Sequence, residues 1–194
     1  MKISIEKKKQ LLLDSFELLK DDYEENQSSL HDIVGKMAKI DTDISVSMWK
    51  YLIEKNPKVL HNEGDFGYWF MDAIERAVGE EGIVKIVTAD DFLKKSIYGG
   101  CGDLDSNPLY VIQWLILKDE LSTASELMEL VFSNKHKSNS LYHILDNIIP
   151  DEDEQITEEA FELLNSWIKK VRGKAERAKL NLKMLDFMDE DDDE

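Results

Sequence analysis

One short stretch near the middle of the chain gathers residue types that can bind ions, cradle phosphates or attack a substrate. Residues 97–108 read IYGGCGDLDSNP, with three glycines, two aspartates and the only cysteine of the sequence. Four interpretations compete for it: a calcium loop, a phosphate-binding loop, a nucleophilic cysteine, and a connection between two helices.

The two ion-binding interpretations lack residues that they require. Asp103, Asp105 and Asn107 are spaced like the first ligands of an EF-hand loop. Pro108 and Trp114, however, stand where that loop needs a glycine and a bidentate glutamate. The glycines do not have the spacing of GxGxxG. They do not match GxxxxGK[ST] either, because no lysine follows them in the required place. We therefore expect no bound cofactor.

A nucleophilic Cys101 would need a histidine close to it in space. The spacing of the histidines matches neither a local cysteine-protease signature nor a metal motif such as HExxH. We therefore expect no catalytic and no metal-ligating residues. A lone cysteine also excludes a disulfide within the chain and fits a reducing compartment. The histidines are His31, His61, His136 and His143.

The interpretation as a connection between helices needs the fewest assumptions. Gly99 suits the left-handed residue that ends a helix, Asn107 is a preferred N-cap, and Pro108 fits the first helical position. Asp103 and Asp105 would place negative charge ahead of the positive helix end. This stretch is predicted to be a hinge, and contact with a partner is a secondary hypothesis.

Helices must position these residues, because apolar side chains recur at three- and four-residue spacing along most of the chain. We expect an all-α fold of antiparallel helix pairs, stacked as a short helical-repeat solenoid or a multi-helix bundle. It should form one domain over residues 1–188, with an acidic disordered tail over 189–194. The clearest stripes are Leu11, Leu12, Phe16 and Leu19; Leu30, Ile33, Val34 and Met37; and Ile44, Met48, Trp49, Leu52 and Ile53.

Helix ends are predicted from local chemistry. Capping boxes are expected at Thr88 and at Thr123, each followed three residues later by an acid. A helix should stop at Asn56, which precedes a proline. Residues 83–87, IVKIV, fit a helix or a strand.

A weak internal repeat overlays three helices, with starts at Ile44, Glu120 and Ile156. Apolar residues recur four and eight residues after each start, and the starts indicate a period of about 36–38 residues. The recurring residues are Met48 and Leu52, Ala124 and Met128, and Ala160 and Leu164. This pattern resembles HEAT or TPR-like α-helical repeats, without the TPR signature spacing. The resemblance implies a protein that binds other macromolecules along a groove.

The charge of the chain selects among possible partners. The 24 Lys and Arg against 41 Asp and Glu give a net charge of −17, of which −12 falls in residues 98–194. Such a field repels nucleic acid and anionic lipid and attracts cationic surfaces, although acidity can also serve solubility alone. We expect a basic protein partner, no direct nucleic acid and no membrane. Asp14 and Glu17 interrupt the apolar residues near the start, so we expect a cytoplasmic protein.

The basic segment 169–183 holds seven basic residues and one acidic residue, shortly before the final DEDDDE. Alone it would suggest nucleic acid, but the neighbouring acids favour intramolecular or head-to-tail charge pairing.

The function predicted from these features is non-catalytic protein binding, as an inhibitor or immunity-type protein that engages a basic, nucleic-acid-handling partner. The alternatives are a small metal- or cysteine-dependent enzyme that uses the Cys101 loop, and a scaffold or assembly adaptor. The candidate contact residues are Tyr68, Asp103, Asp105, Asp151, Glu152, Asp153 and Glu154.

Overall fold

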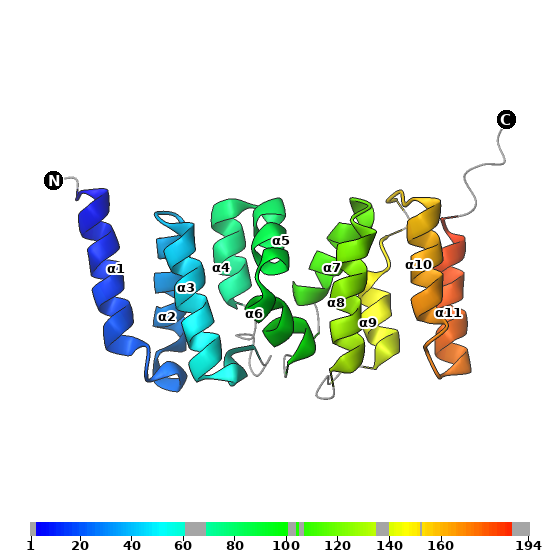
Figure 1. Ribbon diagram of the computed structural model, residues 1–194, viewed down its shortest axis with the longest axis horizontal. Helices are drawn as coiled ribbons and strands as arrows, with labels where there is room; N and C mark the ends of the chain where they lie inside the picture. The colour runs from blue at the N-terminus through cyan, green and yellow to red at the C-terminus, as the bar shows by residue number, and fades with distance from the viewer. Residues whose placement is uncertain are drawn as a thin grey trace. The chain divides into compact units, whose positions relative to one another are not determined.

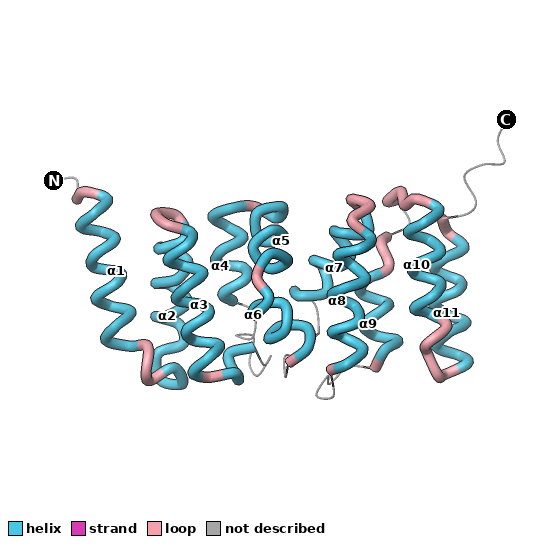
Figure 2. The backbone as a smooth tube through the Cα atoms, in the orientation of Figure 1, coloured by secondary structure: helices cyan, strands magenta, loops and turns pink. Residues whose placement is uncertain are grey.

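The computed structural model describes residues 3–60, 69–100, 104, 107–134, 140–151 and 153–187. All regular structure in these residues is helical, as the colouring of Figure 2 shows, so the all-α class is confirmed. Contacts group the chain into two compact units, unit 1 (residues 1–102) and unit 2 (residues 103–194), and each is described by itself. The single domain over 1–188 stays a prediction, and the expected tail lies outside the described residues.

The helices of unit 1 pack mainly against helices close to them along the chain (Figure 1). They are α1 (Ile5–Leu19), α2 (Tyr23–Ala38), α3 (Thr42–Lys55), the 3-10 turn η1 (Pro57–Leu60), α4 (Trp69–Val78), α5 (Glu80–Ala89), α6 (Asp91–Lys94) and the π-helical turn η2 (Lys95–Gly99). Residues 83–87, which the sequence left open, are helical within α5. The predicted stop is confirmed, because α3 ends directly before Asn56.

The core of unit 1 is centred on α2, which packs against α1, α3 and α4. Its predicted stripe is buried, with Leu30, Val34 and Met37 fully inside. Gly35 lets α4 approach closely, since a Cβ atom at this position would lie 3.2 Å from Ala73 Cβ. On α3 the largest buried side chain is Trp49, with no exposed surface.

The stripe predicted on α1 is buried only in part. Phe16 is 5% exposed, whereas Leu11 is 52% exposed, and Leu12 and Leu19 are half-buried. Among the described helices only α2 packs extensively against α1. The outer apolar residues of α1 therefore remain on the surface.

The capping box predicted at Thr88 is wrong. Helix α5 runs through Thr88, whose hydroxyl donates to the Val84 carbonyl at 2.8 Å. The cap of α6 is instead Asp90, whose carboxylate accepts the Leu93 amide at 3.0 Å and pairs with Lys50 of α3. Burial raises the pKa of Asp90, but the hydrogen bonds from Lys50 and Leu93 outweigh burial and lower it. Asp90 thus joins α3 to the start of α6.

Replacing Asp90 with alanine is expected to lower the free energy of unfolding by about 1–2 kcal/mol, because both the cap and the ion pair are lost. Urea unfolding followed by far-UV circular dichroism measures the change. Asp90→Asn is the matched control, since its side-chain oxygen can still accept the Leu93 amide and only the charge is removed. Equal losses in the two variants would show that the cap contributes nothing.

Unit 2 is also built of helices that pack against neighbours and next neighbours along the chain. Its helices are α7 (Asn107–Leu117), α8 (Leu121–Ser133), α9 (Leu141–Ile148), α10 (Glu158–Ile168) and α11 (Lys174–Leu185). The capping box predicted at Thr123 is wrong, because α8 already begins at Leu121. The buried apolar residues of unit 2 include the repeat positions Ala124, Met128, Ala160 and Leu164, and in unit 1 Met48 and Leu52 are buried as well.

Several side-chain hydrogen bonds within each unit join residues that are about 40 positions apart in the sequence. Other bonds span fewer residues, such as the Lys9 to Asp41 ion pair, which spans 32. The longer bonds join His31 to Trp69 and Asp119 to Thr157, each 38 residues apart, Lys50 to Asp90, 40 apart, and Glu129 to Lys170, 41 apart. These separations are close to the period that the apolar pattern indicates.

The stretch over residues 97–108 joins two helices, as predicted, because η2 ends at Gly99 and α7 begins at Asn107. Two details of that prediction are wrong. Among the described glycines it is Gly79, and not Gly99, that has a positive φ angle. Asn107 is the first helical residue rather than the N-cap, so Pro108 occupies the second position. No helix within the described ranges is both long enough and apolar enough to cross a membrane.

Candidate partner-binding site

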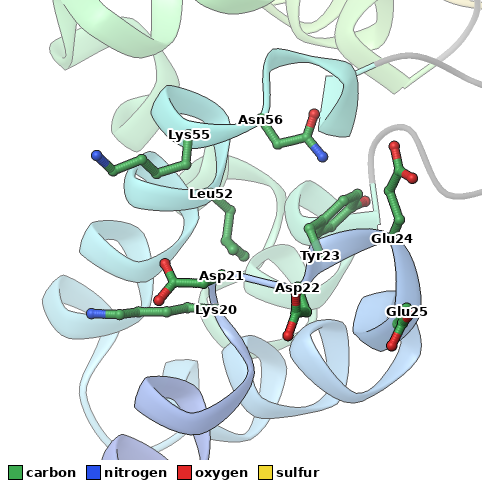
Figure 3. Close-up of a pocket in the computed structure, with 9 residues that line it drawn as sticks. All are labelled: Lys20, Asp21, Asp22, Tyr23, Glu24, Glu25, Leu52, Lys55 and Asn56. Carbon is green, nitrogen blue, oxygen red and sulfur yellow. The ribbon is translucent and has the colours of Figure 1, made fainter.

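An open hollow of about 510 Å³ lies in unit 1 between the α1–α2 turn and the end of α3 (Figure 3). Leu52 lies at its centre, and the side chains of Lys20 and Lys55 extend on one side of it. The other lining residues are Asp21, Asp22, Tyr23, Glu24, Glu25 and Asn56. Carboxylates outnumber lysines in this lining, so the hollow favours cations.

Hydrogen bonds hold the polar groups beside the hollow. The Tyr51 hydroxyl donates to Asp21 Oδ1 at 2.9 Å, and this bond is the main cause of the raised pKa of Tyr51. Lys20 pairs with Glu17 at 2.6 Å and lies 4.8 Å from the centroid of the Tyr51 ring. Burial raises the pKa of Tyr23 to about 12. Both phenols therefore stay protonated at neutral pH.

The hollow does not bring together a catalytic constellation. Within the described residues, no group of three histidine, cysteine, aspartate or glutamate side chains could hold a metal ion. Asp22, Glu24 and Glu25 are exposed at the start of α2, where negative charge stabilises the helix dipole. The hollow can attract a cationic group.

A second acidic surface forms in unit 2 where two turns meet. The Thr157 hydroxyl caps α10 by accepting the Ala160 amide at 3.2 Å, and it donates to Asp119 Oδ1 at 2.8 Å. Asp119 lies in the turn between α7 and α8 with a φ angle of 59°. This turn and the start of α10 lie at the same end of unit 2 in both ribbon and tube views (Figures 1 and 2).

We call this surface the acidic edge. Its carboxylates come from the α7–α8 turn, the connection before α10, and the first turn of α10, and all of them are exposed. Within the described part of unit 2, none forms an ion pair with a lysine or arginine. The acidic edge consists of Asp119, Glu120, Asp151, Asp153, Glu154, Glu158 and Glu159.

The predicted contact residues divide into two groups. Asp151, Asp153 and Glu154 are exposed, lie next to one another in the connection before α10, and belong to the acidic edge. Their role as contacts stays a prediction. The remaining candidates lie outside the described residues, as does Cys101: they are Tyr68, Asp103, Asp105 and Glu152.

Sequence reasoning missed the other members of the acidic edge. Glu158 and Glu159 are acids in a first turn, which complement the helix dipole. That role alone explains them in the sequence, so they were not predicted to contact a partner. Asp119 had no comparable local signal. Its neighbour Thr157 is 38 residues away, and a non-glycine residue with positive φ is rarely predictable from sequence.

The basic segment 169–183 is used in part within unit 2. Lys170 pairs with Glu129 at 3.3 Å and lies 3.7 Å from the centroid of the Phe132 ring. Lys183 donates to the carbonyl oxygens of Asp146 and Ile149 at 3.0 and 3.1 Å, at the C-terminal end of α9. The Lys170–Glu129 ion pair fits the prediction of intramolecular charge pairing for one of the seven cations, whereas Lys183 binds backbone carbonyl groups.

His31 of α2 is half-buried and packs against the start of α4. Its Nε2 atom donates to the Trp69 carbonyl at 2.8 Å, and its ring contacts Trp69 edge-on. Burial lowers the pKa of His31, against the effect of that hydrogen bond. Nearby, burial raises the pKa of Asp72 on α4. These shifts follow from packing, and they indicate a core-edge histidine.

Stability is expected to fall as the pH drops below the ordinary histidine pKa of 6.5. His31 binds a proton more readily in the unfolded chain than in the folded protein. The free energy of unfolding therefore decreases as the pH falls from the unfolded pKa of His31 to its lower folded pKa. The raised pKa of Asp72 acts in the opposite direction at lower pH, above its ordinary value of 3.8. Urea midpoints of the unsubstituted chain and of His31→Gln, from about pH 8 to about pH 5.5, measure the difference. An equal slope in both proteins would contradict the assignment.

His143 is exposed on α9 and contacts the Tyr142 ring at 5.1 Å, while His61 and His136 lie outside the described residues. Comparison with known proteins adds no relative: no protein-family model, no curated protein and no solved structure matches this chain.

Proposed function

We propose that this chain is a non-catalytic protein-binding protein whose acidic edge engages a basic surface on a partner. The observation that carries the proposal is the set of exposed carboxylates that find no cation within the described part of unit 2. An exposed carboxylate without a cation is well solvated, so leaving it unpaired costs little free energy in water. Its interaction with a cationic surface on a partner is favourable. Elsewhere in the chain, acids such as Asp41 and Asp90 are paired.

The acidic edge suits a rigid contact because its two halves are tied together. The hydrogen bond between Thr157 and Asp119 fixes the α7–α8 turn against the cap of α10. Negative groups held in fixed places lose less entropy on binding than groups on a free chain. A partner that normally binds phosphates offers the complementary cationic surface, so we propose inhibition of a nucleic-acid-handling enzyme.

We also propose that the helix pairs form a short HEAT-like repeat. The buried apolar pairs at matching offsets support this, as do the bonds that join residues 38–41 apart. In solenoids each repeat packs against its neighbours, which produces bonds of about one period. The lone cysteine suits a reducing compartment, and we propose a cytoplasmic location.

Affinity capture from the native host tests the function. The tagged protein is incubated with lysate at low and at high salt, and captured proteins are identified by mass spectrometry. A basic protein held at low salt and released at high salt is the expected result, because screening weakens contacts between exposed charges. Added DNA should compete for the partner. Capture that is indifferent to salt, or capture of no basic protein, would reject the electrostatic mechanism.

A further inference from the structure

The surface of α1 carries an apolar groove with a cationic rim. The groove has a volume of about 510 Å³ and lies between α1 and the C-terminal half of α2. On α1, Ile5 is 63% exposed and Leu11 is 52% exposed. Exposed apolar residues that are grouped rather than scattered mark a binding surface. The groove is lined by Ile5, Lys8, Leu11, Leu12, Lys36, Lys39 and Ile40.

The charge of this groove is opposite to the charge of the chain. Lys8 and Lys39 form no ion pair with a described residue, whereas Lys36 pairs with Asp32 at 2.8 Å. The chain as a whole carries −17. An apolar surface rimmed by two available lysines favours an occupant that is both apolar and acidic.

The C-terminal segment of this chain has that chemistry. Residues 185–194 read LDFMDEDDDE, in which three apolar residues are followed by an unbroken run of acids. The last helix, α11, already presents apolar residues to solvent, with Leu182 63% exposed and Leu185 49% exposed. The first and the last helices therefore carry complementary surfaces: apolar with lysines on α1, and apolar with acids after α11.

We propose that the α1 groove of one copy binds residues 185–194 of a second copy. We place the occupant in a second copy, and the dependence of association on concentration, described below, tests that placement. Such a contact uses two different surfaces, so each copy can give its C-terminal segment to one neighbour and receive that of another. Association therefore grows with concentration and weakens with salt.

Two variants test the contact in the full-length chain. The groove variant carries Lys8→Glu and Lys39→Glu, both at surface positions. The tail variant carries Phe187→Ser and Met188→Ser and keeps every acid. Light scattering measures the average mass over a range of concentrations, and circular dichroism checks that the helices are retained. The unsubstituted chain should gain mass with concentration, and each variant alone should stay monomeric.

An equimolar mixture of the two variants provides the decisive measurement. The intact groove of the tail variant can accept the intact tail of the groove variant, so a one-to-one dimer that does not grow further is expected. A mixture that stays monomeric, or an unsubstituted chain that never associates, would overturn the proposal. Association that survives in either variant alone would also overturn it. Binding of the monomeric chain to anionic phospholipid vesicles through Lys8 and Lys39 would assign the groove to lipid instead.

Discussion

Trp49→Ala is expected to lower the free energy of unfolding by about 3–5 kcal/mol, the largest stability effect of any single change considered for this chain. The indole has no exposed surface and lies in α3 at the core of unit 1. Removing it loses the burial of a large apolar side chain and leaves a cavity that the surrounding helices fill only in part. Urea unfolding followed by circular dichroism gives the change.

Trp49→Phe separates the effect of volume from the effect of the indole nitrogen. Trp49 Nε1 is buried and has no hydrogen-bond partner among the described residues. An unpaired buried donor is unfavourable, so phenylalanine removes a cost while it retains most of the apolar volume. We expect a clearly smaller loss than for alanine. Leu18→Ala, at a side chain that is 81% exposed, is the surface control. A loss as large there would contradict the packing argument.

Neutralising the acidic edge is expected to slow association with the captured basic partner about tenfold or more at low salt. The variant carries Asp153→Asn, Glu154→Gln, Glu158→Gln and Glu159→Gln. Each replacement keeps the size of the side chain and removes its charge, so the attraction that guides the two surfaces together is reduced. Surface plasmon resonance at several salt concentrations measures the association rate, whose dependence on salt should become weaker.

A matched control removes the same amount of charge from unit 1. Asp22→Asn, Glu24→Gln, Glu25→Gln and Asp43→Asn alter exposed acids at the starts of α2 and α3. The two variants lose the same number of charges from exposed positions at or before helix starts, so the comparison isolates the place of the lost charge. Equal slowing in both would show that total charge, and not the acidic edge, governs the encounter. A larger effect in the control would move the site to the hollow beside α2.

The sequence was most informative about burial with a helical period. The stripes on α2 and α3 are inside as predicted, because a helix that lacks a buried apolar face is not stable at this length. The α1 stripe was predicted in the same way, but only Phe16 is buried and Leu11 is exposed. A local pattern shows that a face is apolar, but it does not show whether another helix covers it.

Caps were predicted less well because a threonine followed by an acid also occurs inside helices. Thr88 and Thr123 each fit a capping box, yet both lie inside helices. Asp90 takes the role at α6 with an ion pair from Lys50, which is 40 residues away. The acidic edge was predicted only in part. Its local acids can be read from the sequence, but the bond from Thr157 to Asp119 joins residues 38 positions apart and cannot.

The bonds that join residues about forty positions apart also bear on how the chain folds and opens. Closing a loop of some forty residues costs little entropy beyond that of a shorter one, so each unit should collapse rapidly from neighbouring helices without waiting for distant segments to meet. Helix α1 buries Phe16 alone and should be the first to exchange its amide protons with solvent. Local unfolding of α1 would leave the amide protons at the centre of unit 1 protected from exchange.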